Sequence, residues 1–217
     1  MSISENLLKI RAELPDEVVL VAVSKTKSAE EILQAYSSGQ RVFGENRIQE
    51  MVEKHDMLPK DIAWHMIGHV QRNKVKYMAP FVSLIHGVDS LKLLKEINKQ
   101  GEKHGRKLSC LLQVHIAEES SKFGFSSEEL EALTASGELD NLEYVTVSGL
   151  MGMATFTSDM EQVRREFKGL KRLIDNLRGS LPELETLSMG MSGDYKIAIQ
   201  EGSNMVRIGS SIFGARN

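Results

Sequence analysis

The sequence predicts a single (β/α)8 barrel, an α/β fold of the TIM-barrel class, built from 217 residues. Eight short apolar runs rich in β-branched residues alternate with segments of helical spacing, as in a parallel sheet with crossover helices. Both faces of the run VVLVAV at residues 18–23 are apolar, which is typical of a strand covered on both sides. Because no Gly-x-Gly-x-x-Gly turn follows this strand and the length suits a minimal barrel, a closed barrel is favoured over an open doubly wound sheet.

The predicted elements alternate along the whole chain. An amphipathic helix over residues 1–11 comes first, and the strongest later helical spacing lies at residues 90–104 and 158–177. The chain stops at Asn217, soon after the last strand, so we expect the N-terminal helix to cover the place of a full eighth outer helix. Residues 1–217 are therefore treated as one domain. The eight strands are predicted at residues 18–25, 41–46, 63–68, 82–89, 108–116, 142–151, 185–190 and 205–210.

Composition excludes several classes of protein. With 41% hydrophobic and 26% charged residues, the chain is expected to be compact and water-soluble, and no apolar run is long enough for a transmembrane helix. A net charge of -3 without a basic block argues against nucleic-acid partners and against binding to acidic membranes. The single cysteine, Cys110, lies in an apolar run, so we expect a core residue of a protein in a reducing, cytoplasmic compartment.

Lys25 is the first candidate for chemistry. It closes the first strand on the same face as Val21 and Val23, the face that a barrel turns inward, and barrel active sites lie at this end of the strands. Partial desolvation lowers the pKa of a lysine and yields the neutral amine that attacks aldehydes. The alternative is a strand-end lysine that reaches solvent, as we expect for Lys27.

Two loops near the C-terminus have the composition of a phosphate site. In LSMGMSGD, residues 187–194, a strand ends and a helix begins with Ser192 as its expected N-cap, while Met189 and Met191 are expected to pack around the site. RIGSS, residues 207–211, repeats the arrangement. Helix starts present unpaired N–H groups to phosphate, and barrels frequently bind phosphate after strands seven and eight. Either loop alone is weak evidence, because Ser-Gly turns before helices are common.

Two further side chains leave alternatives open. Arg207 lies in an apolar strand, where it either pairs with a carboxylate or faces an electron-rich ligand atom such as a pyridine nitrogen. Asn46 ends the second strand, where its amide either orients a phenolic oxygen or caps the following helix. His65 and His69 are four residues apart, but in a strand that runs into a loop, so no zinc site is expected.

Glycines stand at or near the ends of six predicted strands. A backbone without a side chain permits a sharp turn or the close approach of a ligand at these positions, and turn formation alone explains part of them. In a barrel these strand ends form one rim. The six residues are Gly44, Gly68, Gly87, Gly149, Gly190 and Gly209.

These segments resemble the pyridoxal 5′-phosphate (PLP) homeostasis proteins, whose fold is the barrel domain of alanine racemase. The similarity runs through AVSK at 22–25, FGEN at 43–46, HMIG at 65–68 with Gln71, Asn73 and Lys74, VDS at 88–90, SKFGF at 121–125, GLMGM at 149–153, LSMGMSGD at 187–194 and VRIGSSIFG at 206–214. The last two blocks are the most specific. Departures are His115, where asparagine is expected, and Ala154 with Thr155, which lack the usual proline; they concern loop shape.

The resemblance implies a site for PLP at the rim of the barrel. Lys25 would hold the cofactor as a Schiff base, and its phosphate would lie on Ser192 and the backbone of Gly209 and Ser210. Arg207 would face the pyridine nitrogen, and the asparagine of the second strand would lie near the ring. The full set of cofactor-binding residues is Lys25, Asn46, Met191, Ser192, Arg207, Gly209 and Ser210.

The expected function is a PLP carrier or regulator in vitamin B6 and amino-acid homeostasis. An arginine cannot accept the ring proton, so carbanion stabilisation is weak, and the chain ends at the barrel without the domain that supplies the opposing base in alanine racemase. No robust catalysis is therefore expected. Possible partners are PLP-dependent apoenzymes, the state is monomer or weak dimer, and Lys122 is either a second anion ligand or a solvated lysine. The alternatives are a low-efficiency amino-acid racemase that uses Lys25 as a base and a Schiff-base aldolase acting on a sugar phosphate.

Overall fold

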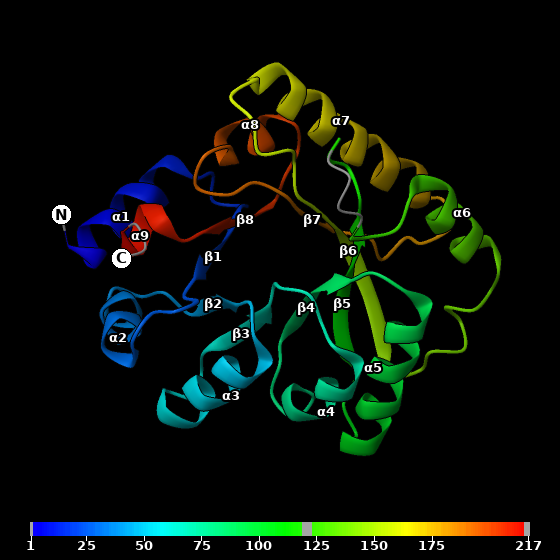
Figure 1. Cartoon of the computed structure of the whole chain (residues 1–217), viewed down its shortest axis with the longest axis horizontal. Coiled ribbons are helices and arrows are strands. Elements are labelled where there is room, and N and C mark those ends of the chain that lie inside the picture. The colour runs from blue at the N-terminus through cyan, green and yellow to red at the C-terminus, as the bar shows by residue number, and fades with distance from the viewer. Residues whose placement is uncertain (1, 119–122, 215–217) are drawn as a thin grey trace.

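The eight predicted strands close into one parallel barrel in chain order (Figure 1). This computed structural model describes residues 2–118 and 123–214. The last strand pairs in parallel with the first, which completes the barrel. The predicted fold class is confirmed.

Each predicted strand is present and is trimmed by at most three residues at either end, except that the sixth strand extends one residue further than predicted, to Gly152. The strands are β1 (Val19–Val23), β2 (Val42–Glu45), β3 (Ala63–Met66), β4 (Leu84–Val88), β5 (Leu108–Val114), β6 (Val145–Gly152), β7 (Thr186–Ser188) and β8 (Met205–Ile208). The helices are α1 (Ile3–Glu13), α2 (Ala29–Ser37), α3 (Ile48–Met57), α4 (Val75–Met78), α5 (Leu91–His104), α6 (Ser127–Ala135), α7 (Met160–Leu177), α8 (Tyr195–Gln200) and α9 (Ser210–Phe213), with a 3-10 turn at Arg72–Lys74. No helix in these described ranges is long and apolar enough to cross a membrane.

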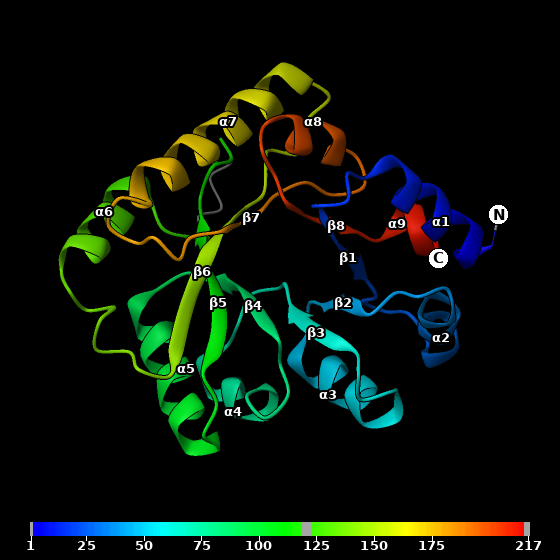
Figure 2. The same ribbon diagram turned by 180° about the vertical axis from the view of Figure 1, so that it is seen from behind.

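The N-terminal helix is held by a capping box at its first residues and by a hydrogen bond from one of its side chains to α9. Ser2 and Glu5 form a reciprocal capping box, in which the Ser2 side chain accepts from the Glu5 N–H and the Glu5 side chain accepts from the Ser2 N–H. Asn6 Nδ2 donates to the carbonyl oxygen of Ile212 at 3.1 Å, and both ribbon views place α1 beside α9 (Figures 1 and 2). Helix α1 thus lies beside the short α9 that follows β8, as expected for a helix that takes the place of a full eighth outer helix.

The apolar residues fill two separate layers. An outer layer lies between the strands and the helices and contains Phe43, Trp64 and Cys110, all with no exposed surface, so the prediction of a core cysteine is confirmed. A smaller inner cluster of buried residues fills the barrel itself and consists of Val21, Leu84, Leu111, Met151 and Met205. Buried side chains of this size each contribute roughly 1.5–3 kcal/mol. Beyond the inner cluster, toward the carboxyl ends of the strands, the interior becomes polar.

Two of the six glycines, Gly149 within β6 and Gly190 after β7, are required by a neighbouring strand or a turn rather than by a ligand. A Cβ on Gly149 would lie 1.8 Å from the carbonyl oxygen of Thr186, its register partner on β7. Gly190 adopts a φ of +97°, which L side chains rarely adopt, and it turns the chain out of β7. The close approach expected at these glycines is therefore confirmed at Gly149, but its partner is protein backbone.

Candidate functional site

Lys25 lies in a β-turn directly after β1 and is half-buried. The N–H of Lys27 donates to the carbonyl oxygen of Ser24 at 3.0 Å and closes this turn. The expectation that Lys27 reaches solvent is wrong, because its Nζ donates to the carbonyl oxygen of Phe213 at 3.1 Å and pairs with Glu31 at 3.2 Å. Helix α9 lies over the end of β1 and supplies that carbonyl acceptor, a tertiary contact that a local pattern does not reveal.

Arg207 is buried in β8 and makes no ion pair within the described ranges. Nη1 donates to the carbonyl oxygen of Ser188 at 2.9 Å and to its hydroxyl at 2.6 Å, and Nη2 donates to the carbonyl oxygen of Gly152 at 3.0 Å. Burial lowers the pKa of Arg207 to about 10, while the charge of Asp194 acts to raise it, so the guanidinium stays cationic at neutral pH. The alternative of a carboxylate pair is thus wrong, and Nε and one N–H of Nη2 have no acceptor in the described part of the chain.

A chain of hydrogen bonds runs from Arg207 across the barrel interior to two histidines. Ser188 Oγ lies 3.1 Å from Nδ1 of His86, and Nε2 of His86 lies 3.0 Å from Nδ1 of His65. The guanidinium only donates, so its positive charge favours a Ser188 hydroxyl that donates to His86, which in turn donates from Nε2 to His65. Burial lowers the pKa of His65 to about 4 and that of His86 well below its usual value, so both rings are neutral at neutral pH.

The two C-terminal loops meet through Ser192. Its hydroxyl oxygen accepts from the backbone N–H of Gly209 at 3.3 Å. The prediction that Ser192 caps the following helix is wrong, because the N-cap of α8 is Asp194, whose Oδ1 accepts from the N–H of Met191 at 2.6 Å. That turn leaves Ser192 ahead of the helix, where it bridges the loops after β7 and β8.

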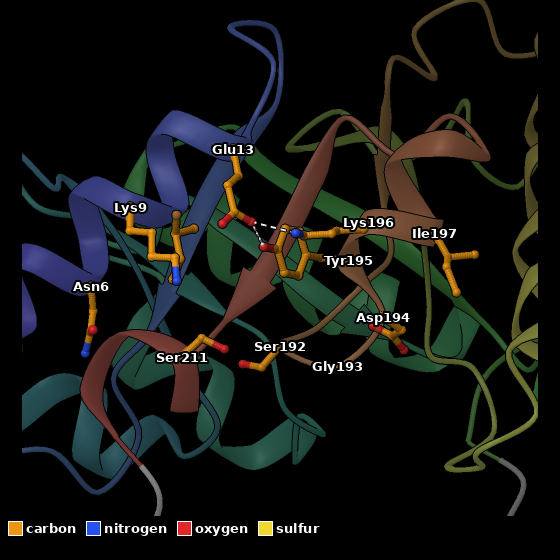
Figure 3. Close-up of a pocket in the computed structure, with 11 residues that line it drawn as sticks. Asn6, Lys9, Glu13, Ser192, Gly193, Asp194, Tyr195, Lys196, Ile197 and Ser211 are labelled. Atoms are coloured by element: carbon orange, nitrogen blue, oxygen red, sulfur yellow. Dashed lines mark hydrogen bonds and ion pairs between the residues drawn. The ribbon is translucent and has the colours of Figure 1, made fainter. Parts of the chain in front are cut away.

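Hydrogen-bond donors without an acceptor among the described residues lie close to Ser192. The backbone N–H groups of Ser210 and Ser211, at the start of α9, have no hydrogen-bond acceptor among residues 2–118 and 123–214, and both residues are exposed. Figure 3 shows the hydroxyls of Ser192 and Ser211 pointing toward one another, with Lys9 of α1 close by. These side chains belong to the lining of a pocket of about 420 Å³ between α1, α8 and α9. The arrangement can hold an anion with backbone and hydroxyl donors.

Helix α1 forms the far wall of this pocket. Glu13 accepts from the hydroxyl of Tyr195 at 2.6 Å and pairs with Nζ of Lys196 at 2.9 Å, as the dashed lines in Figure 3 show. Burial, followed by the bond to Glu13, raises the pKa of Tyr195 to about 12. These contacts fix the start of α8 against α1, so the loop that carries Ser192 has a defined position.

Asn46 follows β2 and is half-buried. The capping alternative is wrong, because the N-cap of α3 is Arg47 and no side chain caps this helix. Asn46 lines a hollow of about 250 Å³ together with His69, Gln71 and Lys74, and its amide makes no hydrogen bond to another described residue. The amide is thus open to a ligand.

The two methionines of the loop after β7, Met189 and Met191, differ in burial. Met191 is 37% exposed and lines a hollow of about 210 Å³ on the same rim, as expected for a residue around the site. Met189 is fully buried in the outer apolar layer instead. Lys122 lies outside the described residues.

Several polar groups around the site were not predicted. His86 and Ser188 belong to the hydrogen-bond chain of Arg207, and Glu45, Glu50 and Lys54 form a cluster behind Lys25. Spacing contained a signal for Lys54, because it continues the buried face of α3 three residues after Met51. Alternation likewise places His86 on the face of Leu84, which turns into the barrel.

Comparisons with known proteins agree over the full length of the chain. The family model described as alanine racemase, N-terminal domain, matches residues 1–217. The pyridoxal phosphate homeostasis protein of Vibrio alginolyticus is 41% identical over 208 residues, which cover 94% of this chain and 88% of that protein. The one from Bos taurus is 42% identical and covers 91% of this chain and 77% of its own length.

Solved structures show the same fold. PipY of Synechococcus elongatus is 34% identical, with TM-scores of 0.93 without PLP and 0.90 with PLP bound, over 98% of this chain and 100% of PipY. An alanine racemase of Clostridium difficile has a TM-score of 0.81 at 18% identity and matches 99% of this chain with 57% of its own length, a likeness of fold alone. The chain belongs to the pyridoxal phosphate homeostasis protein family and has the barrel of the alanine racemase N-terminal domain.

Proposed function

We propose that this chain binds PLP at the carboxyl end of the barrel, as a Schiff base on Lys25, and acts in PLP and amino-acid homeostasis. The observation that carries the proposal is the set of open donors at one rim: Nε of Arg207 and the N–H groups of Ser210 and Ser211, beside the turn that holds Lys25. PipY, at 34% identity, has been solved with PLP bound, which supports the same ligand here.

The loops after β7 and β8 suit the phosphate. A phosphate needs several donors, and the backbone N–H groups of Ser210 and Ser211 offer two without an internal acceptor. The hydroxyl of Ser192 adds a third, because its oxygen accepts from Gly209 and its proton is left to donate. The phosphate is thus bound by neutral donors, and Met191 would pack beside the ring.

Arg207 suits a neutral pyridine ring. It can donate to the ring nitrogen through an N–H that has no internal acceptor, and it cannot accept a proton in return. The amide of Asn46 is open to the ring oxygen. When bound, PLP supplies a reactive aldehyde and an electron-accepting ring, and the second property is weak while the nitrogen stays unprotonated.

This arrangement favours storage and release over turnover. Lys25 masks the aldehyde reversibly, and an incoming amine or an apoenzyme lysine can exchange with it. We propose PLP-dependent apoenzymes as the recipients. Amino-acid racemisation is disfavoured, because Arg207 and not a carboxylate would face the ring nitrogen, and an arginine cannot accept the ring proton.

Borohydride trapping tests the proposal. Protein loaded with PLP is reduced, digested and examined by mass spectrometry, and we expect one reduced PLP on the peptide that contains Lys25. Lys25→Ala should carry none, whereas Lys27→Arg, the matched control two residues away, should be labelled like the wild type. Absence of an adduct, or an adduct on another lysine, would contradict the proposal. Exchange of the substrate α-hydrogen in deuterated water would instead support the racemase.

A further inference from the structure

Helix α3 holds the peptide groups on both sides of Lys25. Nζ of Lys54 donates to the carbonyl oxygen of Ser24 at 2.7 Å, and the N–H of Thr26 donates to Oε1 of Glu50 at 2.5 Å. We propose that Glu50 and Lys54 are positioning residues that hold Lys25 in the conformation that captures an aldehyde. The inference rests on the proposed function and adds a second group of residues to it.

The turn that carries Lys25 is strained. Within the described ranges, Thr26 is the only residue other than glycine with a positive φ, at 64°. Its place is the third position of the turn that the Ser24 carbonyl closes, where glycine or asparagine is usual and a β-branched residue is an outlier. Strain of this kind persists only where surrounding contacts hold it, and it concentrates at functional sites. The bond from Thr26 to Glu50 is such a contact.

The cluster behind the turn is largely buried, and Lys54 is its centre. Nζ of Lys54 donates to three oxygens, one on Ser24, one on Glu45 at 2.8 Å and one on Glu50 at 2.7 Å, which uses all its protons. Oε1 of Glu45 also accepts from the Ser24 hydroxyl at 2.6 Å, and this glutamate has no exposed surface. Burying such an ion pair usually costs more than well-packed apolar residues would, so the requirement of folding alone does not account for it.

The cluster holds the backbone on both sides of Lys25 from the helix side of the sheet. Glu45 alternates with Gly44, which faces the barrel interior against Val21, so the Glu45 side chain lies on the helix side of the sheet. Glu50 and Lys54 approach from α3 on that same side. Neither lines any of the three rim hollows described above, so we assign both a positioning role.

Substitutions at Glu50 separate positioning from folding. Its side chain is 22% exposed, so Glu50→Ala and Glu50→Gln are expected to fold, and urea unfolding checks this. The matched control is Glu53→Ala, at an exposed position of the same helix. PLP trapped on Lys25 by borohydride is measured as a function of PLP concentration. The affinity for PLP should be about tenfold weaker in Glu50→Ala than in the wild type, because a charge-assisted hydrogen bond is lost. Glu50→Gln, which keeps an oxygen for the Thr26 N–H, should recover most of it.

A second variant relieves the strain that the cluster holds. Glycine adopts positive φ freely, so in a Thr26→Gly background the same Glu50→Ala change should weaken PLP capture by less than about threefold. Equal losses in the two backgrounds, or unchanged capture by Glu50→Ala, would overturn the inference, since a merely structural role predicts no such coupling.

Amide hydrogen exchange separates this inference from the proposed function. In cofactor-free protein the N–H of Thr26 should exchange slowly, and at least about tenfold faster in Glu50→Ala. If the Thr26 N–H is protected but wild-type protein captures no PLP on Lys25, the proposed function is wrong, whereas the role of Glu50 in holding the turn is supported. If Thr26 is unprotected in the wild type, the positioning role fails whatever the ligand.

Discussion

Acid should destabilise the folded protein through the two histidines inside the barrel. His65 and His86 are buried and hydrogen-bonded to each other, and burial lowers the pKa of His65 to about 4 and that of His86 well below its usual value. In the unfolded chain both rings regain an ordinary pKa near 6.5. Between about pH 7.5 and about pH 5, therefore, the unfolded chain takes up protons that the folded protein refuses.

The sign and size of the effect follow from this difference. Because the unfolded state binds more protons below its pKa, the free energy of unfolding falls as the pH drops through 6.5 toward 4. For His65 the loss is about 2 kcal/mol at about pH 5. Burial lowers the pKa of His86 as well, so its contribution has the same sign and adds to this loss.

Urea denaturation at the two pH values measures the loss. With a slope of about 2–3 kcal/mol per molar urea, the midpoint should fall by about 1 M or more. His65→Gln keeps an oxygen acceptor for His86 and should lose less stability on acidification than the wild type. His104→Gln removes an exposed imidazole from the end of α5 and should leave the loss intact. Equal stability at both pH values, or the same loss in His65→Gln, would refute the assignment of neutral buried rings.

Three further outcomes follow from other parts of the structure. Burial raises the pKa of Cys110 to about 12, so native protein should resist Ellman's reagent and react only as fast as it unfolds, unless the thiol is reachable in the folded state. Gly149→Ala should cost more than about 3 kcal/mol in urea unfolding, because its Cβ would lie 1.8 Å from the Thr186 carbonyl oxygen; a stable variant would contradict the register of β6 and β7. Ser192→Ala should weaken PLP retention about fivefold in a fluorescence titration and leave the binding of unphosphorylated pyridoxal unchanged, and an equal loss for both ligands would place the phosphate elsewhere.

The sequence predicted strands and faces well, because both follow from short periodic patterns. The doubly apolar run of β1 indicated a strand covered on both sides, and its alternation placed Val21 inside the barrel, where the inner cluster has it. The order of strands followed from the βα alternation, since consecutive parallel strands joined by helices become neighbours. Cys110 was predicted in the core for the same local reason.

Hydrogen-bond partners could not be predicted, because they depend on segments far apart in the chain. Ser192 matched the pattern of a helix cap, yet its partner is Gly209, seventeen residues later, and Asp194 stands at the N-cap position instead. Lys27 has its acceptor on Phe213, at the other end of the chain. A pattern identifies residues able to bond and the face on which they lie, and tertiary packing selects the partner.

Two buried cations, Arg207 inside the barrel and Lys54 behind β1, are stabilised by different kinds of partner. Arg207 is a buried charge whose hydrogen-bond partners in the described residues are all neutral, and the chain of dipoles runs from Ser188 to His86. Lys54 is a buried charge balanced by two carboxylates on the helix side of the sheet. A carboxylate beside Arg207 would accept from the N–H groups that are now open at the rim. Neutral partners leave the charge of Arg207 and two of its donors available to a ligand. Neutral hydrogen-bond partners inside the barrel therefore leave these two donors of Arg207 open toward the rim.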